Sequence, residues 1–243
     1  MIQPPPEPST RITYDSSDLA LFAKARNWKT YWSGRLRSYI KGQVIEVGAG
    51  LGTSTEYMCK QEYPEWICLD PDPSHASHLA QRIASQELPP FCKVKCCVLK
   101  DLAVDVMVDT ILYIDVLEHI ENDEAEMRVA ASHLKRGGQV VVLSPAFNCL
   151  YSPFDKTVGH RRRYSTKDIK RLTVKNLVVQ KWFFLDSIGF FASLCNRTLL
   201  KSPMPSSAQI AIWDRVMVPV SRYADGVFGA VFGKTIVIVW EKV

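Results

Sequence analysis

The chain has 243 residues, of which 47% are hydrophobic and 23% charged, a composition typical of a globular domain rather than a disordered chain. This length allows one large α/β domain with a hydrophobic core. The formal net charge of +5 is mild, so the chain lacks the strongly basic balance of most nucleic-acid-binding proteins. Positive charge is concentrated in residues 156–175, which contain eight Lys and Arg residues and one acid.

The N-terminal sequence MIQPPPEPST has no basic region followed by an apolar run, so no signal peptide is predicted. No uninterrupted apolar run approaches the roughly 18 residues of a membrane span. The seven cysteines are odd in number and include no pair of CxxC sites with zinc spacing. We therefore predict a reduced, cytoplasmic protein without a membrane span, beginning with a loose segment over residues 1–18.

Short apolar runs alternate with helical patterns after residue 18. Residues 19–40 predict an N-terminal helical cap. Residues 43–143 predict a parallel sheet covered by helices on both faces. The strands of this half are predicted at Gln43–Val47, Trp66–Asp70, Lys93–Leu99, Thr110–Asp115 and Gln139–Leu143, and the helices at Thr53–Lys60, Ser74–Ser85 and Asp123–Leu134.

A loop over residues 144–166 follows, and Thr166–Leu172 predicts a helix with Ser165 or Thr166 as its N-cap. Two further strands are predicted at Leu177–Phe183 and Thr235–Val239. The residues between them, 184–232, are rich in aromatic side chains and predict a helical insertion. The whole of residues 19–243 is thus expected to form a single domain.

The stretch VIEVGAGLGTST, residues 44–55, places three glycines between a predicted strand and a predicted helix. Glycines at such a position let the backbone turn tightly and approach a ligand near a helix N-terminus. The spacing is GxGxG, with Glu46 two residues before the first glycine, whereas a dinucleotide fingerprint needs GxGxxG. A nicotinamide or other nucleotide site is the alternative for this loop.

Two carboxylates follow the loop at the spacing of a nucleotide site. Asp70 ends the second predicted strand, 20 residues after Gly50, where a carboxylate can accept both hydroxyls of a ribose. Asp101 follows the third strand, where it can contact an adenine amine. The fourth strand ends in DVLEHI, residues 115–120, at the same edge of the sheet.

These motifs resemble those of the class I S-adenosylmethionine-dependent methyltransferases in order and spacing. ARNWKTYW, the stretch from Pro145 to Ser165 and the C-terminal FGKTIVIVWEK look like a bacterial subgroup often associated with family 2 glycosyltransferases. The resemblance implies a Rossmann-like sheet of seven strands, parallel except for the last. It implies S-adenosyl-L-methionine as cofactor, bound by Glu46, Gly48, Ala49, Gly50, Gly52, Asp70, Pro71, Asp101, Leu102, Asp115 and Val116.

DVLEHI places Asp115, Glu118 and His119 on one side of a helical turn, and His160 follows the fifth strand. We interpret His119 and His160 as candidate catalytic residues and assign no metal ligand. Similar motifs bind a divalent metal in small-RNA 2′-O-methyltransferases and ubiquinone-pathway O-methyltransferases, so a metal role stays open. A purely structural Glu-His pair is the third interpretation.

The acceptor is predicted to contact Tyr31, Tyr151, Arg161 and Tyr164. The three arginines from Arg161 to Arg163 are alternatively solvated or used to brace the loop. Tyr31 belongs to an aromatic stripe that suits either a core or a cover over the site. The pair Cys96-Cys97 is interpreted as core packing within a strand.

The sequence therefore predicts methyl transfer, more readily to oxygen or nitrogen than to carbon, on a small or medium-sized metabolite. A sugar, a glycolipid intermediate and a secondary metabolite are the acceptor classes considered. An RNA methyltransferase using the basic 160–175 region and a non-catalytic cofactor-binding scaffold are the alternatives. Nucleic acid is not the favoured partner, and the oligomeric state stays open.

Overall fold

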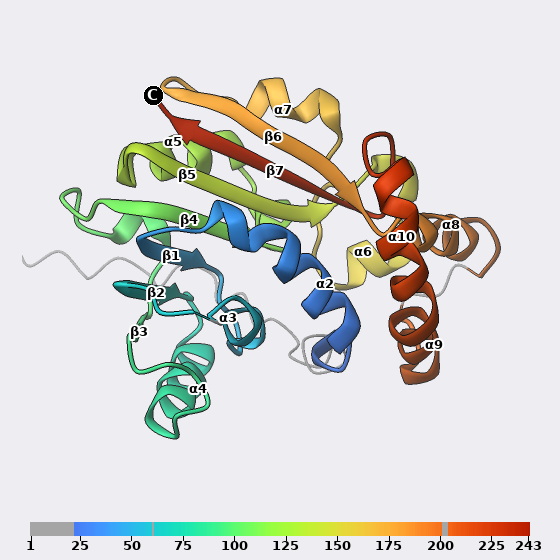
Figure 1. Ribbon diagram of the computed structural model, residues 1–243, viewed down its shortest axis with the longest axis horizontal. Coiled ribbons are helices and arrows are strands. Elements are labelled where there is room, and N and C mark those ends of the chain that lie inside the picture. Colours follow the sequence, from blue (N-terminus) through green and yellow to red (C-terminus); the bar gives the residue numbers. More distant parts are fainter. Residues whose placement is uncertain (1–21, 60, 201–203) are drawn as a thin grey trace, which may run out of the picture.

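The computed structural model describes residues 22–59, 61–200 and 204–243. Its centre is one seven-stranded sheet with the order β3-β2-β1-β4-β5-β7-β6 (Figure 1). The segment 1–18, predicted to be loose, lies outside the described residues. The strands are β1 (Gln43–Val47), β2 (Glu65–Leu69), β3 (Cys92–Lys95), β4 (Val108–Ile114), β5 (Leu134–Pro145), β6 (Leu177–Leu185) and β7 (Thr235–Lys242).

Strands β1 to β5 pair in parallel, and β7 runs antiparallel to both of its neighbours, β5 and β6. This confirms the predicted Rossmann-like fold, in which only the last strand is reversed. Because the parallel strands share one direction, their carboxyl ends lie along one edge of the sheet, and loops that follow them converge there.

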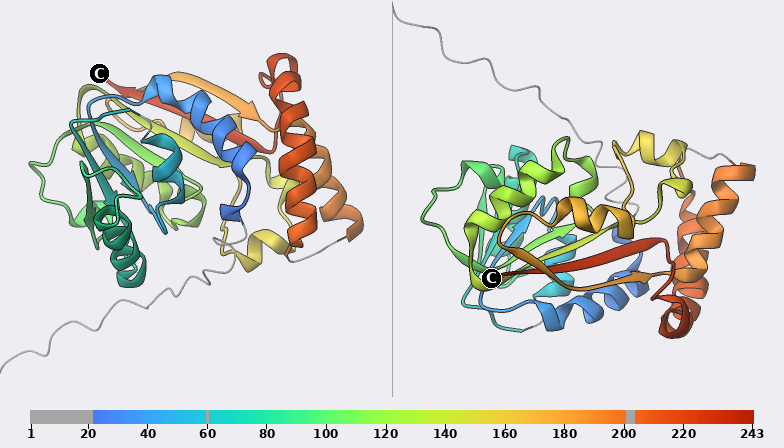
Figure 2. Two further views of the ribbon diagram at one scale, coloured as in Figure 1. Left: turned by 60° about the horizontal axis from the view of Figure 1, so that its bottom comes forward. Right: turned by 90° about the horizontal axis from the view of Figure 1, so that it is seen from above.

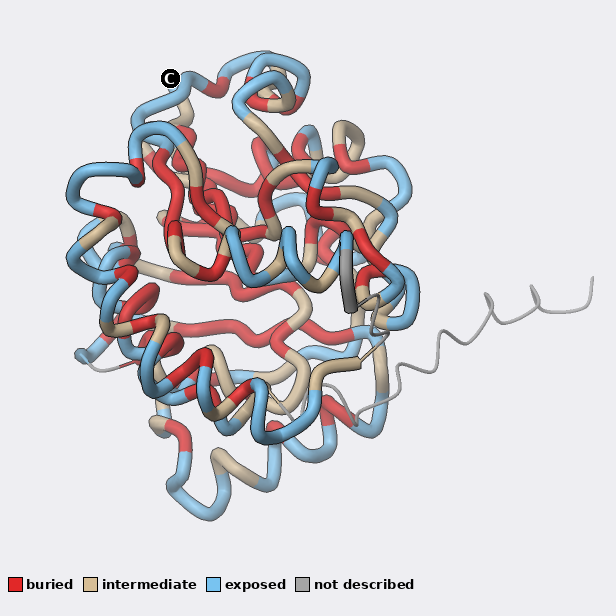
Figure 3. The backbone as a smooth tube through the Cα atoms, turned by 90° about the vertical axis from the view of Figure 1, so that its right-hand side faces the viewer, coloured by how far each residue is buried: buried red, intermediate tan, exposed pale blue. Residues whose placement is uncertain are grey.

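Helices cover both faces of the sheet (Figure 2). One buried cluster joins the sheet to Trp32 of α2, Met58 of α3 and Leu79 of α4; the cluster on the other face joins it to Met127 of α5 and Leu172 of α7. Buried positions are concentrated in the strands, and exposed ones in the surrounding helices and loops (Figure 3). The α-helices outside the insertion are α2 (Arg26–Leu36), α3 (Thr53–Met58), α4 (Pro73–Ala84), α5 (Asp123–His133), α6 (Pro153–Thr157) and α7 (Thr166–Leu172).

The insertion predicted over residues 184–232 is helical between β6 and β7. Its first residues, Phe184 and Leu185, complete β6, because they pair with Ile236 and Thr235 of β7. The helical elements are α8 (Ser187–Cys195), η5 (Asn196–Leu200), α9 (Ser207–Ile212), η6 (Trp213–Met217) and α10 (Val218–Phe228). They stand together at one end of the sheet, beside α2 (Figure 1).

Two sequence predictions at the sheet were wrong. The strand predicted at Lys93–Leu99 ends at Lys95, because its only neighbour, β2, ends at Leu69. Cys96 is therefore exposed rather than packed in a core, and Cys97 is half-buried. The strand predicted to begin at Gln139 begins at Leu134, where it pairs with Val108 before a register shift. Within the described residues, no helix is long and apolar enough to cross a membrane.

Candidate active site

The glycine-rich loop joins β1 to α3 in a conformation that demands glycine. Gly48, Gly50 and Gly52 have φ angles of 66°, 56° and 75°, in the left-handed region. A Cβ on Gly48 would lie 2.7 Å from Cγ2 of Val116, and one on Gly52 would lie 2.7 Å from Cδ2 of Leu79. The loop is thus packed closely from behind, and its backbone forms the surface offered to a ligand.

Of the two carboxylates predicted to contact the ligand, Asp70 is bonded to this loop, and Glu46 is bonded to the helix and the strand beside it. Oδ2 of Asp70 accepts a hydrogen bond of 2.8 Å from the backbone N–H of Gly50. Oε2 of Glu46 accepts bonds from Oγ1 of Thr55 at 2.7 Å and Nε1 of Trp66 at 2.9 Å. Burial raises the pKa of Glu46 to about 7, although the bonds from Thr55 and Trp66 act in the opposite direction.

A cavity of about 230 Å³, here called the loop cavity, opens in front of the glycine loop. One wall is the backbone of residues 48–51, with Thr53 and Ser54 from the start of α3. The opposite wall carries Asp115, His119 and His160. The aromatic residues Trp28 and Trp32 of α2 close one side, so the N-terminal helix covers the cavity as well as the core.

Lys29 and Asp115 place opposite charges in the loop cavity. The side chain of Lys29 is 7% exposed, and no described residue engages its ammonium in a hydrogen bond or ion pair. Burial lowers the pKa of Lys29 to about 8, while Asp115 acts to raise it. Desolvation by the surrounding protein raises the pKa of Asp115 to about 6, and the charges of His160, Lys234 and Lys29 act to lower it. Asp115 is nevertheless an exposed residue that lines the cavity.

The backbone of Asp115 is itself unusual. Its φ angle is 54°, in the left-handed region that non-glycine residues seldom adopt. Its N–H donates to the carbonyl of Leu143 at 2.8 Å, so the residue is anchored where β4 leaves the sheet. Strained residues of this kind cluster at functional sites, where the surrounding structure enforces them.

The two histidines belong to a chain of ionisable side chains at the same end of the cavity. Nδ1 of His160 lies 2.8 Å from Oδ1 of Asp155, and Nε2 of His160 lies 3.8 Å from Oε1 of Glu118. The rings of His119 and His160 meet edge to face with centroids 4.8 Å apart. Oε2 of the buried Glu118 accepts a bond of 2.9 Å from Oγ of Ser144.

Burial and neighbouring charges shift the pKa values of these groups in different directions. Burial alone would lower the pKa of His160, but its bond to Asp155 and the charge of Glu118 raise that pKa above its ordinary value. Burial and the neighbouring His160 lower the pKa of His119 to about 4, so His119 is neutral near pH 7. Burial raises the pKa of Glu118 to about 7. The pKa values of the two neighbouring imidazoles are therefore shifted in opposite directions, that of His160 upward and that of His119 downward.

Glu118, His119 and His160 each offer one ligand atom, and these atoms lie within 4.8 Å of one another. One carboxylate and two imidazoles form a donor set that suits a transition metal such as zinc or iron. Asp155 bonded to the other ring nitrogen of His160 is the kind of outer partner that orients a ligating histidine. The same geometry equally suits proton transfer, so the cluster is chemically able to serve either role.

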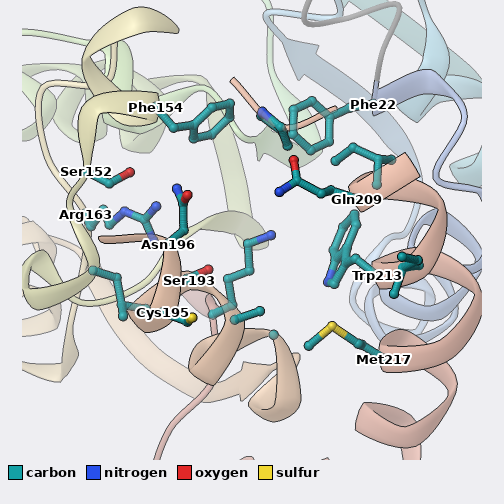
Figure 4. A pocket seen from close by; sticks show the side chains of 17 residues that line it. Phe22, Ser152, Phe154, Arg163, Ser193, Cys195, Asn196, Gln209, Trp213 and Met217 are labelled. Atoms are coloured by element: carbon teal, nitrogen blue, oxygen red, sulfur yellow. The ribbon is translucent and has the colours of Figure 1, made fainter. Parts of the chain in front are cut away.

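A second cavity, of about 320 Å³, lies between α6 and the helical insertion and is here called the insertion cavity. Figure 4 shows side chains from both regions pointing into it, including Phe154, Asn196 and Gln209. Most of its lining is apolar. Five residues line both cavities and form the wall between them: Phe22, Phe154, Arg163, Trp213 and Lys234.

Lys234 is the polar centre of this shared wall. Its Nζ lies 4.1 Å from the centroid of the Trp213 ring, in a cation–π contact. Burial lowers the pKa of Lys234, while Asp186, Asp115 and Asp155 oppose that shift. A cation is therefore held between the glycine loop and the apolar insertion cavity.

The structure brings part of the predicted site together. The catalytic candidates His119 and His160 line the loop cavity, as do Gly48, Ala49, Gly50 and Asp115. The other predicted cofactor contacts do not line either cavity: Glu46, Gly52, Asp70, Pro71, Asp101, Leu102 and Val116.

None of the four predicted acceptor contacts lines either cavity. The hydroxyl of Tyr31 donates to Oδ2 of Asp225 at 2.8 Å, and that of Tyr151 donates to the carbonyl of His160 at 2.6 Å. The hydroxyl of Tyr164 lies 2.9 Å from Oδ2 of Asp123 and 3.0 Å from the carbonyl oxygen of Leu117, so its one proton is shared between these acceptors. Arg161 donates to the carbonyl of His119 at 3.1 Å.

The basic run is used mainly to fasten the loop. Arg162 forms an ion pair of 2.8 Å with Asp123 and donates to the carbonyl of Glu121. Arg163, which is 4% exposed, donates to both carboxylate oxygens of Asp155. Arg161 and Arg162 thus tie this run to the segment that follows β4, whereas Arg163 ties it to α6. These contacts position His160 beside His119.

Residues 45–140 match the family model of a methyltransferase domain. This part of the chain is similar to methyltransferase domains, and the matched residues make up less than half of the chain. A comparison of the chain with curated proteins gave no match.

Three solved structures have a similar fold. A geranyl diphosphate C-methyltransferase from Streptomyces coelicolor has a TM-score of 0.65 at 13% identity, with 98% of this chain and 86% of that chain covered. An S-adenosylmethionine-dependent methyltransferase from Clostridium acetobutylicum has a TM-score of 0.57 at 14% identity, with 94% and 96% covered. Coclaurine N-methyltransferase has a TM-score of 0.57 at 14% identity, with 90% and 72% covered.

The loop cavity fits S-adenosylmethionine, the cofactor that the matched methyltransferase domain implies. The glycine loop presents backbone without side chains, and at Gly48 a Cβ would collide with Val116. Lys29 and Asp115 place an ammonium and a carboxylate at this cavity, and S-adenosylmethionine carries a carboxylate and an ammonium at its methionine end. Sequence reasoning missed Lys29, although its place in ARNWKTYW, within a helix next to the cofactor motif, was a usable signal.

Proposed function

We propose that this methyltransferase acts on a small or medium-sized metabolite held in the insertion cavity, with methyl transfer occurring at the wall shared with the loop cavity. The observation that carries the proposal is that shared wall of five side chains, two of them cationic. The mostly apolar lining of the insertion cavity favours an acceptor with an apolar body. A lipid-linked sugar or a secondary metabolite meets this description better than a free sugar.

The cofactor supplies a methyl group already activated on a sulfonium, so the protein's main task is to align the acceptor with it. Lys29 would bind the carboxylate at the methionine end of the cofactor and Asp115 the ammonium. The glycine loop would support the ligand from below. Oriented charges of this kind in an enclosed cavity bind strongly because little water competes with them.

An oxygen or nitrogen acceptor must lose a proton, and we infer that His160 takes it. The bond between Nδ1 of His160 and Asp155 fixes the ring so that Nε2 is the nitrogen directed toward Glu118 and the cavity. A carboxylate bonded to one ring nitrogen stabilises the imidazolium that forms when the other nitrogen accepts a proton. His119, with a pKa of about 4, is neutral near pH 7 and contributes a hydrogen-bonding partner beside His160.

The basic 160–175 region supports an RNA substrate less well. Arg161, Arg162 and Arg163 are all engaged by groups of the protein itself. Arg171 is paired with Asp123 at 2.6 Å. Four of the positive charges that suggested nucleic acid are therefore committed to holding the loop and α7.

A cytoplasmic location belongs to the same proposal. The seven cysteines are free thiols, and the Sγ atoms of Cys59 and Cys92 lie 4.0 Å apart without a disulfide. Free thiols are ordinary in a reducing compartment.

The decisive experiment incubates the purified protein with S-adenosylmethionine labelled in its methyl group and a metabolite extract of the source organism. Mass spectrometry should detect a labelled product whose mass has increased by one methyl group in place of hydrogen. Cofactor binding measured by calorimetry, without any labelled product from metabolite or RNA pools, would instead support the non-catalytic scaffold.

A further inference from the structure

The insertion carries a long apolar face that nothing in the described chain covers. Six large side chains recur every three or four residues along α9, η6, α10 and the turn after it, which places them along one side of the helix. Each is more than half exposed. These residues, here called the exposed stripe, are Ile212 at 59%, Val216 at 59%, Val220 at 51%, Tyr223 at 86%, Val227 at 73% and Val231 at 68%.

The stripe is not the core-facing side of the helix. Ile210, Trp213 and Val218 of the same helical run are buried in the core cluster. The run therefore has two apolar faces, of which only one is used within the domain. The packed neighbour α8 adds Phe191, which is 56% exposed, and Leu194 to the exposed apolar surface. Contiguous exposed apolar surface of this kind marks a protein or membrane contact rather than ordinary scattered exposure.

The charges around the stripe are all of one sign. Among the described residues of 187–232, the exposed charged side chains are Arg197, Arg215 and Arg222. The two acids of this segment, Asp214 and Asp225, are buried. Asp214 accepts from the backbone N–H of Trp28, and Asp225 accepts from the backbone N–H groups of Asp186 and Ser187.

The neighbouring helix α2 extends this basic surface. It lies beside α10 (Figure 1), and residues 22–42 contain six Lys and Arg residues and no acid. Of these, Lys24, Arg26, Arg35, Arg37 and Lys41 are exposed. The guanidinium of Arg222 lies 5.8 Å from the centroid of the Tyr31 ring, which joins the arginines of α10 to those of α2.

A second copy of the chain is a poor occupant of this surface. In a two-fold dimer the same patch meets itself, so each arginine of the stripe would face a surface that exposes no acid. Such a contact would bring positive charges together without any counter-charge. The surface instead complements one that is apolar inside and negatively charged outside.

We propose that the exposed stripe docks on the surface of an anionic lipid bilayer, with α10 lying in the plane of the interface. Amphipathic helices in this position bury their apolar face about 5–10 Å into the boundary between headgroups and acyl chains, and flanking basic residues bind anionic headgroups. Ile212 of the exposed stripe also lines the insertion cavity, so docking places the edge of that cavity at the bilayer. The proposal does not depend on which acceptor the enzyme uses.

The test is co-sedimentation of the full chain with vesicles of phosphatidylcholine and phosphatidylglycerol, compared with vesicles of phosphatidylcholine alone. Each basic residue near an anionic surface strengthens binding about fivefold. We expect binding to the anionic vesicles at least about tenfold tighter than to the neutral ones, and weaker at high salt. Arg215→Gln should reduce binding to the anionic vesicles about fivefold.

The apolar part of the surface is tested by the double variant Val216→Glu with Tyr223→Glu, which should lose about tenfold or more in vesicle affinity. The matched control is Val104→Glu, since Val104 is 91% exposed but lies in a loop before β4. Circular dichroism checks that each variant is folded. Two measurements do not depend on the double variant: the binding of the wild-type chain to the two vesicle types, and the binding of Arg215→Gln to the anionic vesicles.

Absence of vesicle binding by the wild-type chain would overturn the proposal, as would equal loss in Val104→Glu. A concentration-dependent dimer in analytical ultracentrifugation that Tyr223→Glu dissociates would assign the stripe to a second copy instead. Methyl transfer to an acceptor in detergent-free solution, unchanged in the double variant, would show that docking and catalysis are separate properties.

Discussion

Arg163 donates two parallel hydrogen bonds to Asp155, of 2.8 Å from Nε to Oδ1 and 3.0 Å from Nη2 to Oδ2. Both side chains are buried, and the same carboxylate holds Nδ1 of His160. These bonds, and the charge of Arg163, hold the pKa of Asp155 well below its ordinary value even though burial acts to raise it. Arg163 of the basic run thus holds Asp155 in place, and Asp155 in turn orients His160, the proposed proton acceptor.

Asp155→Asn tests this role of Asp155. Loss of the carboxylate should lower the pKa of His160, because Asp155 is the main group raising that pKa against burial. If His160 accepts the proton, kcat/KM rises with pH as His160 deprotonates. In the variant, the rising limb should therefore move to lower pH, and the plateau should fall about tenfold to a hundredfold because the ring is no longer oriented.

The measurement combines the pH profile of kcat/KM with NMR titration of the histidine ring signals. Asp168→Asn is a matched control, since Asp168 caps α7 in the same loop region without contacting either histidine. An unchanged pH profile in a folded Asp155→Asn variant would remove His160 from proton transfer and leave it a structural residue.

Lys29→Met tests cofactor recognition. S-adenosylhomocysteine carries the carboxylate that Lys29 is proposed to bind, whereas 5′-methylthioadenosine lacks it. Charge-assisted bonds contribute about 1.5–3 kcal/mol, so calorimetry should show S-adenosylhomocysteine binding about tenfold to a hundredfold weaker. Binding of 5′-methylthioadenosine should change less than about twofold.

Lys24→Met is the matched control, because Lys24 lies just before the same helix but is exposed. It should leave the affinity for both ligands unchanged. Equal losses for the two ligands in Lys29→Met would mean that Lys29 supports the fold of the cavity rather than a carboxylate.

Ser193→Trp tests the insertion cavity. Ser193 of α8 lines that cavity and not the loop cavity, so a larger side chain should fill acceptor space without touching the cofactor. We expect KM for the acceptor to rise about tenfold or more while the affinity for S-adenosylhomocysteine stays within about twofold. Ser193→Ala should have neither effect, and an acceptor KM unaltered by tryptophan would place the acceptor elsewhere.

Glu46→Gln tests the raised pKa of the buried carboxyl. Glu46 ionises near pH 7 in the fold but near 4.3 in the unfolded chain, so the unfolded state releases its proton first as pH rises. The protonated carboxyl therefore stabilises the fold fully below about pH 4.3, and this contribution is lost as pH rises through about 7. It amounts to about 4 kcal/mol at most.

Urea unfolding at about pH 5 and pH 8 measures this effect. The wild type should lose more unfolding free energy than Glu46→Gln between the two pH values, because glutamine does not titrate and still accepts a bond from Thr55 or Trp66. Parallel behaviour of the two proteins would show that Glu46 is ionised in the fold at both pH values.

The fold was readable from the sequence because it depends on local and periodic signals. Alternating apolar runs and helical patterns define parallel strands and their covering helices. The three glycines of GAGLG indicate three positive φ angles within five positions, because glycine adopts that conformation without steric cost. The ends of β3 and β5 were not readable, because they are set by where a neighbouring strand stops or shifts register. Pairing partners are not encoded in a single strand's sequence.

The sequence by itself therefore determined the sheet, the cofactor loop and the arrival of both histidines at one edge. Only the tertiary structure decided which polar groups face a cavity. Lys29 and Lys234, which are 205 positions apart, came to line one cavity, whereas Tyr31, Tyr151 and Tyr164 turned to partners inside the protein. The reason is physical: a side chain's direction depends on which buried acceptor lies within hydrogen-bonding reach, and folding alone brings such groups together.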